Sequence, residues 1–374
     1  MEPRTPGQLI ATLLKQQGWT KRTLAIVLSV DEATVTRLVS DKRPVTATLA
    51  LQLEEVFGVD ADRFLTLQKD YDLQLAKIAF RPDPARAMRA QIFGSLPITE
   101  MIKRGWLPGA DNPKDVAAVE AAVTQFFGVE ALGSVDLLPH AARRTQVGLD
   151  ATPLQLAWLY RVKHIAAEMM VPPYSAAAGE RAVQRLRPLL ASAEEARKVP
   201  RVLAEAGIRF VIVEALPSSK IDGACLWLDA TAPVIAMSFR FDRIDNFWFV
   251  LRHELEHVLQ GHGQSAPVLD IELDGRTDDT VAEEERIANV AASSFVVPPD
   301  KMTGFIARKA PFFAERDILG FASTLGIHPG LVAGQLQHRT QRYDHFRNHL
   351  VKVRSIVAPG ATVDGWGDIA PVGV

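Results

Sequence analysis

Residues 247–259 read FWFVLRHELEHVL, and they lie inside a helical pattern that extends from Asp245 to Gln260. Apolar side chains stand on both sides of the polar ones, so we expect this helix to be buried. Short apolar runs bounded by turn residues precede it, and they predict three strands, at 208–213, 224–228 and 233–239. The pattern therefore predicts a domain that combines a buried helix with a small sheet.

Two histidines in this helix are candidate metal ligands. His253 and His257 are four residues apart, so they share one helical face and both imidazoles can reach the same ion. Glu254 lies about 100° around the helix, where a general base can take a proton from metal-bound water. The alternative is a surface helix with two incidental histidines. The apolar flanks favour the metal site, because buried paired histidines need a partner.

A third ligand is expected downstream of this helix. His262 follows Gly261, which is expected to end the helix, and it lacks the spacing of the extended zincin motif. The acidic run 283–285 offers carboxylates on a second helix, although most of such a run is normally exposed to solvent. Glu285 shares a helical face with Asn289 and is expected to point inward. The predicted cofactor is Zn²⁺, although the same ligand types tolerate manganese.

The metal motif is part of a wider resemblance. Residues 253–257, joined to Glu285-x-x-Ala288-Asn289-x-x-Ala292 and Val296-Val297-Pro298, resemble the ImmA/IrrE family of metallopeptidases. The resemblance implies that His253, His257 and Glu285 hold zinc, that Glu254 is the catalytic base, and that the substrate is a helix-turn-helix repressor. The family usually has glycine in the place of Glu256. This carboxylate could accept an imidazole N–H, or it could crowd the substrate groove and weaken catalysis.

The first 80 residues carry the pattern of short helices with very short connections. An apolar stripe over 9–14 ends at Gly18, and Thr20, Asp31 and Thr46 are expected to cap the next three helices. Residues 20–28 and 31–40 then form a helix-turn-helix pair, of which the second helix reads DNA. The alternative is a small four-helix interaction module.

Seven side chains of this pair and its flanks are candidate DNA contacts. We expect three of them to face base edges, namely Glu32, Thr34 and Arg37. Four basic residues are expected to hold phosphates, namely Lys21, Arg22, Lys42 and Arg43. Residues 1–80 contain ten basic and ten acidic side chains, and the acidic ones cluster at 54–72. Asp31 and Glu32 lie near the expected DNA face and should reduce non-specific affinity.

This region also resembles a known type of regulator. Pro6-Gly7, Lys42-Arg43-Pro44 and Phe64-Leu65-x-Leu67-Gln68-x-x-Tyr71-Asp72-Leu73 are similar to the HigA-type antitoxin branch of the XRE helix-turn-helix family. The resemblance implies a homodimer that binds an operator, represses its own operon and neutralises a ribonuclease toxin.

Composition sets further expectations. The formal net charge is −2, so any DNA contact has to come from a local basic patch. The single cysteine, Cys225, excludes an internal disulfide and is typical of a reducing compartment. No stretch approaches the roughly 20 apolar residues of a membrane span, and the N-terminus lacks the layout of a signal peptide, so we expect a cytoplasmic protein.

These patterns predict an α+β protein that is mainly helical, with a helix-turn-helix bundle at 1–80 and a zincin-like domain at 207–345. A helical connector is expected at 81–206 and a C-terminal tail at 346–374, and the glycine- and proline-rich end after Pro359 is expected to be frayed. Further helices are expected at 280–296, 314–325 and 329–337.

Two functional hypotheses follow. In the first, the protein is a DNA-binding regulator whose zinc metallopeptidase domain cleaves a regulatory protein or the chain itself. In the second, it is a non-catalytic repressor or antitoxin whose metal domain is structural or sensory. Glu256 favours the second hypothesis, and the intact set of His253, Glu254 and His257 favours the first. A small-molecule sensor that uses the cleft near the metal is a third alternative.

Overall fold

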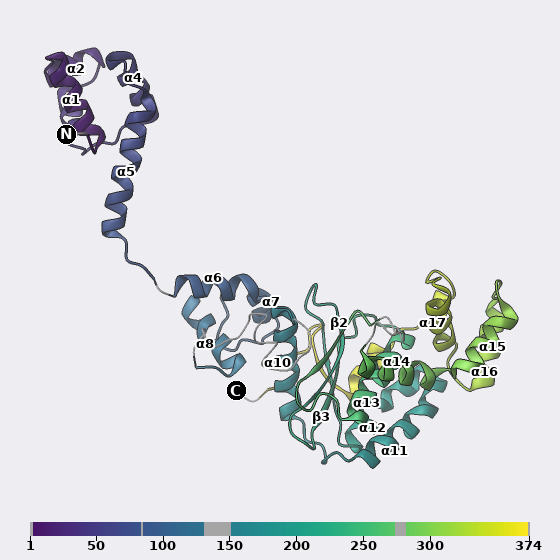
Figure 1. Ribbon diagram of the computed structural model, residues 1–374. Helices are drawn as coiled ribbons and strands as arrows, with labels where there is room; N and C mark the ends of the chain where they lie inside the picture. Colours follow the sequence, from purple (N-terminus) through teal and green to yellow (C-terminus); the bar gives the residue numbers. More distant parts are fainter. Residues whose placement is uncertain (1–2, 84, 131–150, 274–281, 373–374) are drawn as a thin grey trace. The chain divides into compact units, whose positions relative to one another are not determined.

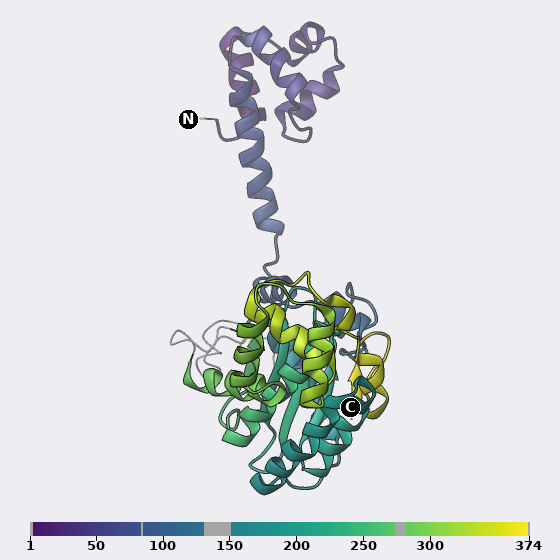
Figure 2. The same ribbon diagram turned by 90° about the vertical axis from the view of Figure 1, so that its right-hand side faces the viewer.

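The computed structural model describes residues 3–83, 85–130, 151–273 and 282–372 (Figures 1 and 2). The chain divides into two compact units, Met1–Pro84 and Ala85–Val374. The expected class is confirmed, because helices dominate and a small mixed sheet lies in the second unit. Within the described residues, no helix is long and apolar enough to cross a membrane.

The first unit is a bundle of five helices: α1 (Pro6–Gln17), α2 (Lys21–Val27), α3 (Glu32–Val39), α4 (Ala47–Phe57) and α5 (Ala61–Ala79). Its core consists of buried aliphatic residues from all five helices, together with Phe64. The expected start of each middle helix is confirmed, because Thr20, Asp31 and Thr46 accept hydrogen bonds from backbone amides of the first turn. Gly18 ends α1 with a φ of 66°, as expected for a left-handed cap.

The start of α1 is attached to the end of α3. Asp41 accepts hydrogen bonds from the Gly7 amide at 2.8 Å and from the Thr5 hydroxyl at 2.6 Å. A Cβ atom at Gly7 would lie 2.6 Å from the carbonyl oxygen of Leu38, so only glycine permits this approach. These contacts hold the N-terminal segment against the helix that is expected to read DNA.

The second unit contains a five-stranded sheet in the order β4-β2-β3-β1-β5. The three expected strands are confirmed as β1 (Arg209–Val213), β2 (Ile221–Trp227) and β3 (Pro233–Met237). Two strands were not expected, namely β4 (Val268–Ile271) and β5 (Thr362–Asp364). β1 runs parallel to β3 and β5, whereas β2 runs antiparallel to β3 and β4.

Helices cover both faces of this sheet, which explains why its central strands are continuous apolar runs. Phe210 and Ile212 of β1 belong to the core on one face, and Val211 and Val213 belong to the core on the other. Figure 1 shows α10 on one side of the strands and α13 on the other. The metal-motif helix therefore lies in an interior layer rather than on the surface.

The face that carries Val211 and Val213 packs against α6 (Arg86–Ser95), α7 (Ile98–Lys103), α8 (Val116–Phe127) and α10 (Pro153–Glu168). The opposite face packs against a larger set: α11 (Ala176–Leu186), η2 (Arg187–Ala191), η3 (Ala193–Lys198), α12 (Val199–Glu205), α13 (Ile244–Gln260), α14 (Glu283–Val296), α15 (Pro299–Lys309), α16 (Glu315–Leu325), α17 (Pro329–Thr340) and α18 (Arg354–Val357). The short helices η4 (Arg347–His349) and η5 (Ala358–Gly360) also belong to the described part of this unit. Thus the residues expected as a connector and as a tail belong to the same compact unit as residues 207–345.

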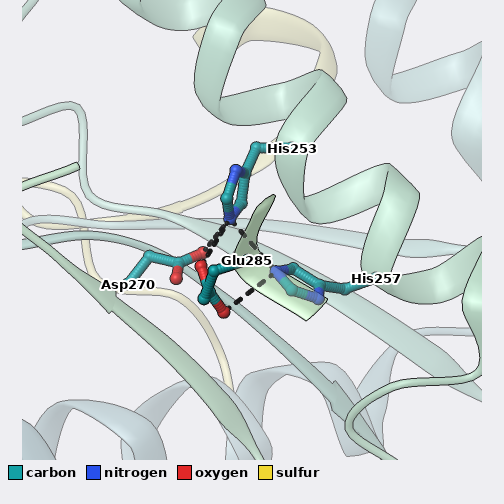
Figure 3. A group of neighbouring side chains, drawn as sticks. All are labelled: His253, His257, Asp270 and Glu285. Atoms are coloured by element: carbon teal, nitrogen blue, oxygen red, sulfur yellow. Dashed lines mark hydrogen bonds and ion pairs between the residues drawn. The ribbon is translucent and has the colours of Figure 1, made fainter. Parts of the chain in front are cut away.

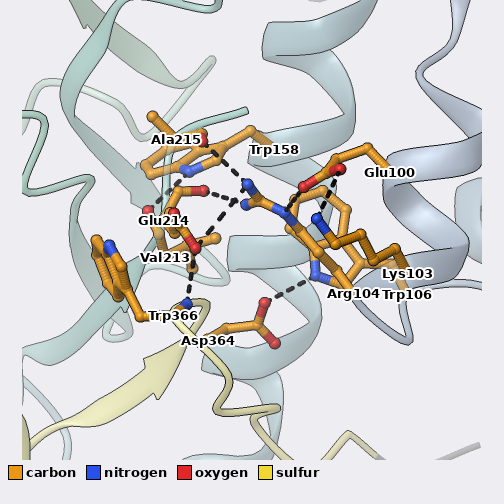
Figure 4. Close-up of polar contacts among 10 residues, drawn as sticks. All are labelled: Glu100, Lys103, Arg104, Trp106, Trp158, Val213, Glu214, Ala215, Asp364 and Trp366. Atoms are coloured by element: carbon orange, nitrogen blue, oxygen red, sulfur yellow. Dashed lines mark hydrogen bonds and ion pairs between the residues drawn. The ribbon is translucent and has the colours of Figure 1, made fainter. Parts of the chain in front are cut away.

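The prediction of a frayed tail is wrong. Asp364 of β5 is buried and forms an ion pair with Arg161 of α10, and it accepts a hydrogen bond from the Trp106 indole at 2.7 Å. Figure 4 shows how Arg104 reaches the carbonyl oxygens of Glu214 and Ala215 beside the same strand. A strand of only three residues carries too weak a pattern to be recognised in the sequence. The contacts with these distant partners hold it in the sheet.

Candidate functional site

Helix α13 brings the two histidines of the motif together in the interior. Both side chains are 0% exposed, and their Nε2 atoms lie 3.1 Å apart. The four-residue spacing places the rings one above the other on the same helical face. Two imidazole nitrogens that face the same point at this separation are typical of a shared cation.

Helix α14 packs beside α13 and contributes Glu285, the expected third ligand. Its Oε2 lies 3.3 Å from His253 Nε2, and its Oε1 lies 3.5 Å from His257 Nε2. The side chain is 29% exposed. The neighbouring acids point elsewhere, because Glu283 forms an ion pair with Arg286 and Glu284 is largely exposed. The structure therefore brings together the three residues that the sequence selected.

A fourth candidate ligand, Asp270, was missed. It lies on β4, is 4% exposed, and places Oδ2 3.1 Å from His253 Nε2. One ligand atom from each of His253, His257, Asp270 and Glu285 falls within 4.8 Å of all the others (Figure 3). The signal in the sequence was a lone carboxylate inside the apolar run 266–271, but it has meaning only once β4 is placed beside α13.

The chemistry of this group fits a divalent cation. Asp270 Oδ2 is buried without a hydrogen bond among the described residues, which is costly unless a cation or a proton compensates. Burial disfavours a charged His253, but the carboxylates of Asp270 and Glu285 outweigh it and raise its pKa to about 9. Burial likewise raises the pKa of Asp270, whereas His253 lowers it, to about 2 overall. The negative field that retains a proton here would also retain a metal ion.

Glu254 lies beside this group in a niche that the sheet provides. Its side chain is fully buried, and burial, followed by the charge of Asp270, raises its pKa well above the ordinary value. The niche exists because Gly223 of β2 has no side chain: a Cβ atom there would lie 2.1 Å from Glu254 Oε1. The position is that of a group able to exchange a proton next to the metal ligands.

Glu256 does not accept an imidazole N–H, which was the first of the two roles considered for it. Its Oε2 pairs with Arg252 at 2.6 Å, and its Oε1 accepts from Gln260 at 2.7 Å. Both oxygens are therefore engaged along their own helix rather than with an imidazole. The residue that contacts His257 from behind is His262, whose Nδ1 lies 2.9 Å from His257 Nδ1. His262, rejected as a ligand, thus orients one.

The first unit presents most of the expected DNA contacts to solvent. Glu32 and Arg37 are exposed on α3, and the four expected phosphate contacts, Lys21, Arg22, Lys42 and Arg43, are exposed as well. The expectation that Thr34 faces a base edge is corrected, because only 5% of this residue is exposed. Its hydroxyl donates to Asp31 at 2.9 Å and accepts from Arg37 at 3.3 Å, so it positions the arginine instead of facing a base.

The exposed face of α3 includes residues that were not expected to contact DNA. The solvent-exposed residues form one stripe at helical spacing, namely Glu32, Ala33, Thr36, Arg37 and Ser40. Ala33 and Thr36 follow from the same periodicity that placed Val35 and Leu38 in the core, so the signal was present. A small side chain and a hydroxyl beside an arginine suit the edges of bases in a major groove.

Two comparisons with known proteins concern the N-terminal region. A family model described as helix-turn-helix matches residues 10–64, which include the whole of α2, α3 and α4. The chain is also 36% identical, over 73 residues, to virulence-associated protein I of Dichelobacter nodosus. That match covers 19% of this chain and 68% of the relative.

Proposed function

This chain belongs to the helix-turn-helix family through its N-terminal domain and is a DNA-binding transcriptional regulator, and from that premise we propose that its second unit is a zinc centre of the metallopeptidase type. The observation that carries the proposal is the convergence of His253, His257 and Glu285 beside the buried carboxyl of Glu254. Two imidazoles and a carboxylate, with a further acid next to them, are the donor set of hydrolytic zinc sites.

Each residue has a role in this proposal. His253, His257 and Glu285 would hold the ion, and His262 would orient His257 through the contact between their Nδ1 atoms. When bound, zinc supplies Lewis acidity for attack on a peptide carbonyl. Glu254 takes the proton of the attacking water, and its raised pKa allows it to hold that proton before passing it to the leaving amine.

The substrate class in this proposal is a protein. The resemblance to the ImmA/IrrE family favours a regulatory protein of the helix-turn-helix kind, and the chain's own segment between the two units is the intramolecular alternative. The resemblance to HigA-type regulators extends the proposal to a homodimer that binds an operator and neutralises a ribonuclease toxin. Cleavage would then couple the metal unit to the control of transcription.

A second candidate function rests on Asp270. With this residue the group offers four protein donors, and a closed set of four is typical of structural zinc rather than catalytic zinc. In that case the second unit is a structural or sensory module of a repressor. Both candidate functions require a bound metal ion, and only the first includes hydrolysis of a peptide bond.

The variant Glu254→Gln tests the catalytic proposal in the full chain. We expect zinc content and binding to duplex DNA to equal those of the wild type, because residue 254 is not a ligand. Self-cleavage and cleavage of a peptide library, followed by mass spectrometry in the presence of zinc, are expected to be lost. Glu283→Gln is the control, since Glu283 is largely exposed and pairs with Arg286. Cleavage that persists in Glu254→Gln would overturn the role of Glu254 as the base. Cleavage that is absent from both the wild type and Asp270→Ala would leave the structural alternative.

A further inference from the structure

Asp270 comes from an element that is independent of the motif helix. β4 pairs only with β2 among the described residues, and Asp270 lies opposite Gly223 in that pairing. Leu269, its neighbour, packs into the core on the other face of the sheet. Because side chains alternate along a strand, Asp270 is directed toward α13. Gly223, which has no side chain, leaves room for the carboxyl of Glu254.

The carboxylate of Asp270 is aimed at the candidate metal ligands and ion-pairs with His253. It is 4% exposed, its Oδ2 lies 3.1 Å from His253 Nε2, and that oxygen accepts no hydrogen bond among the described residues. A buried carboxylate oxygen that faces imidazole nitrogens without a hydrogen bond of its own is rare unless a cation compensates it. In Figure 3 the carboxylates of Asp270 and Glu285 meet the two imidazoles around one point.

Zinc in hydrolytic sites keeps three protein ligands and one open position, whereas four protein ligands close the site. We propose that Asp270 is the fourth ligand of the metal centre and that it occupies the position that substrate or water needs. The centre described here is therefore latent. Asp270 has to withdraw before the site can act, and the ion stays held by His253, His257 and Glu285.

The exposure of the four ligands agrees with this assignment. Both histidines and Asp270 are buried, and Glu285 alone is partly open to solvent, at 29%. An incoming group would have to displace Asp270, because the histidines are anchored inside α13. β4 is an edge strand that pairs with β2 alone among the described strands. A shift of Asp270 therefore disturbs one strand pairing, whereas a shift in a central strand would disturb two. The inference depends on the metal centre proposed above.

Cobalt(II) bound to the full chain is the test, because its visible absorption reports coordination number without requiring activity. We expect wild-type protein to bind one Co²⁺ with the intense bands of four-coordination, and added azide to leave the spectrum unchanged. Asp270→Ala is expected to bind Co²⁺ at least about tenfold more weakly. Its spectrum is expected to change with azide, since a position is then open.

Two further variants complete the experiment. Asp270→Asn keeps the shape of the side chain, so it separates loss of the charged ligand from damage to the fold, and we expect its affinity to fall as well. Glu272→Ala alters an exposed acid at the end of β4 and is the control for disturbing the strand. Equal affinity in all variants, or an azide response in the wild type, would overturn the role of Asp270 alone. Failure of the wild type to bind Co²⁺ would overturn the metal centre itself.

Discussion

Helices α3 and α13 both present candidate functional side chains at helical spacing, but they do so in opposite settings. On α3 the stripe from Glu32 to Ser40 is exposed, and the helix is defined by its own cap at Asp31. On α13 the histidines are fully buried and become a site only through residues of β4 and α14. A surface used for recognition can thus be built locally, whereas a buried metal centre depends on several distant segments.

The difference predicts how substitutions propagate. A change on α3 removes one exposed side chain, and surface substitutions usually leave stability nearly unchanged. A change around α13 alters close packing and buried charge, which makes its effects large and coupled.

Asp364→Leu should have the largest effect. It leaves the Arg161 guanidinium buried without its carboxylate, and breaking such a pair costs about 3–5 kcal/mol. We expect denaturant unfolding of the second unit to shift by that amount, while affinity for duplex DNA is retained. The double variant Arg161→Met with Asp364→Leu should recover much of the loss, because no buried charge remains. Equal stability of the single and double variants would contradict this explanation.

Gly223→Ala should have the next largest effect. The added methyl group would lie 2.1 Å from Glu254 Oε1 and 2.9 Å from Val250, so the strand or the carboxyl must move. Overpacking of this kind costs about 1–3 kcal/mol. We expect a lower free energy of unfolding in chemical denaturation, together with loss of any cleavage. Gly320→Ala is the matched control, since its Cβ meets nothing within 4 Å and α16 should be stabilised or unchanged.

His262→Ala should weaken the metal centre without changing its ligands. Removing the group that holds a ligating imidazole typically lowers metal affinity about 10- to 100-fold. We expect that loss in competition with a chromophoric chelator, with the far-ultraviolet circular dichroism unchanged. Glu283→Gln, at an exposed acid that pairs with Arg286, serves as the control, with affinity close to that of the wild type. Unchanged affinity in His262→Ala would show that α13 alone orients His257.

Lys42→Ala should produce the smallest effect. Loss of one exposed phosphate contact weakens binding to all DNA sequences alike and lowers the slope of log affinity against log salt by about 0.9. The melting temperature should not change, because Lys42 is exposed. Fluorescence anisotropy of labelled duplex DNA at several salt concentrations measures both quantities. Lys69→Ala, on exposed α5, is the control, and an equal loss of slope there would argue against a localised DNA face.

The sequence alone determined the features that depend on neighbours within one turn of helix. Thr20, Asp31 and Thr46 cap their helices as expected, because a cap is a contact across three residues. The pairing of His253 with His257 follows in the same way from helical periodicity. The three central strands were also recognisable, since burial on both faces makes them continuous apolar runs.

Only the tertiary structure decided the features that join distant segments. Asp270 has no motif around it, and β4 becomes a strand by pairing with β2. Asp364 is 203 residues from its partner Arg161, so no local sequence pattern could predict that β5 belongs to the sheet. Thr34 lies at a position expected to face DNA, yet Asp31, Arg37 and Arg43 surround its hydroxyl. The physical reason is the same in each case: a short polar segment acquires its position from the partners that packing brings to it.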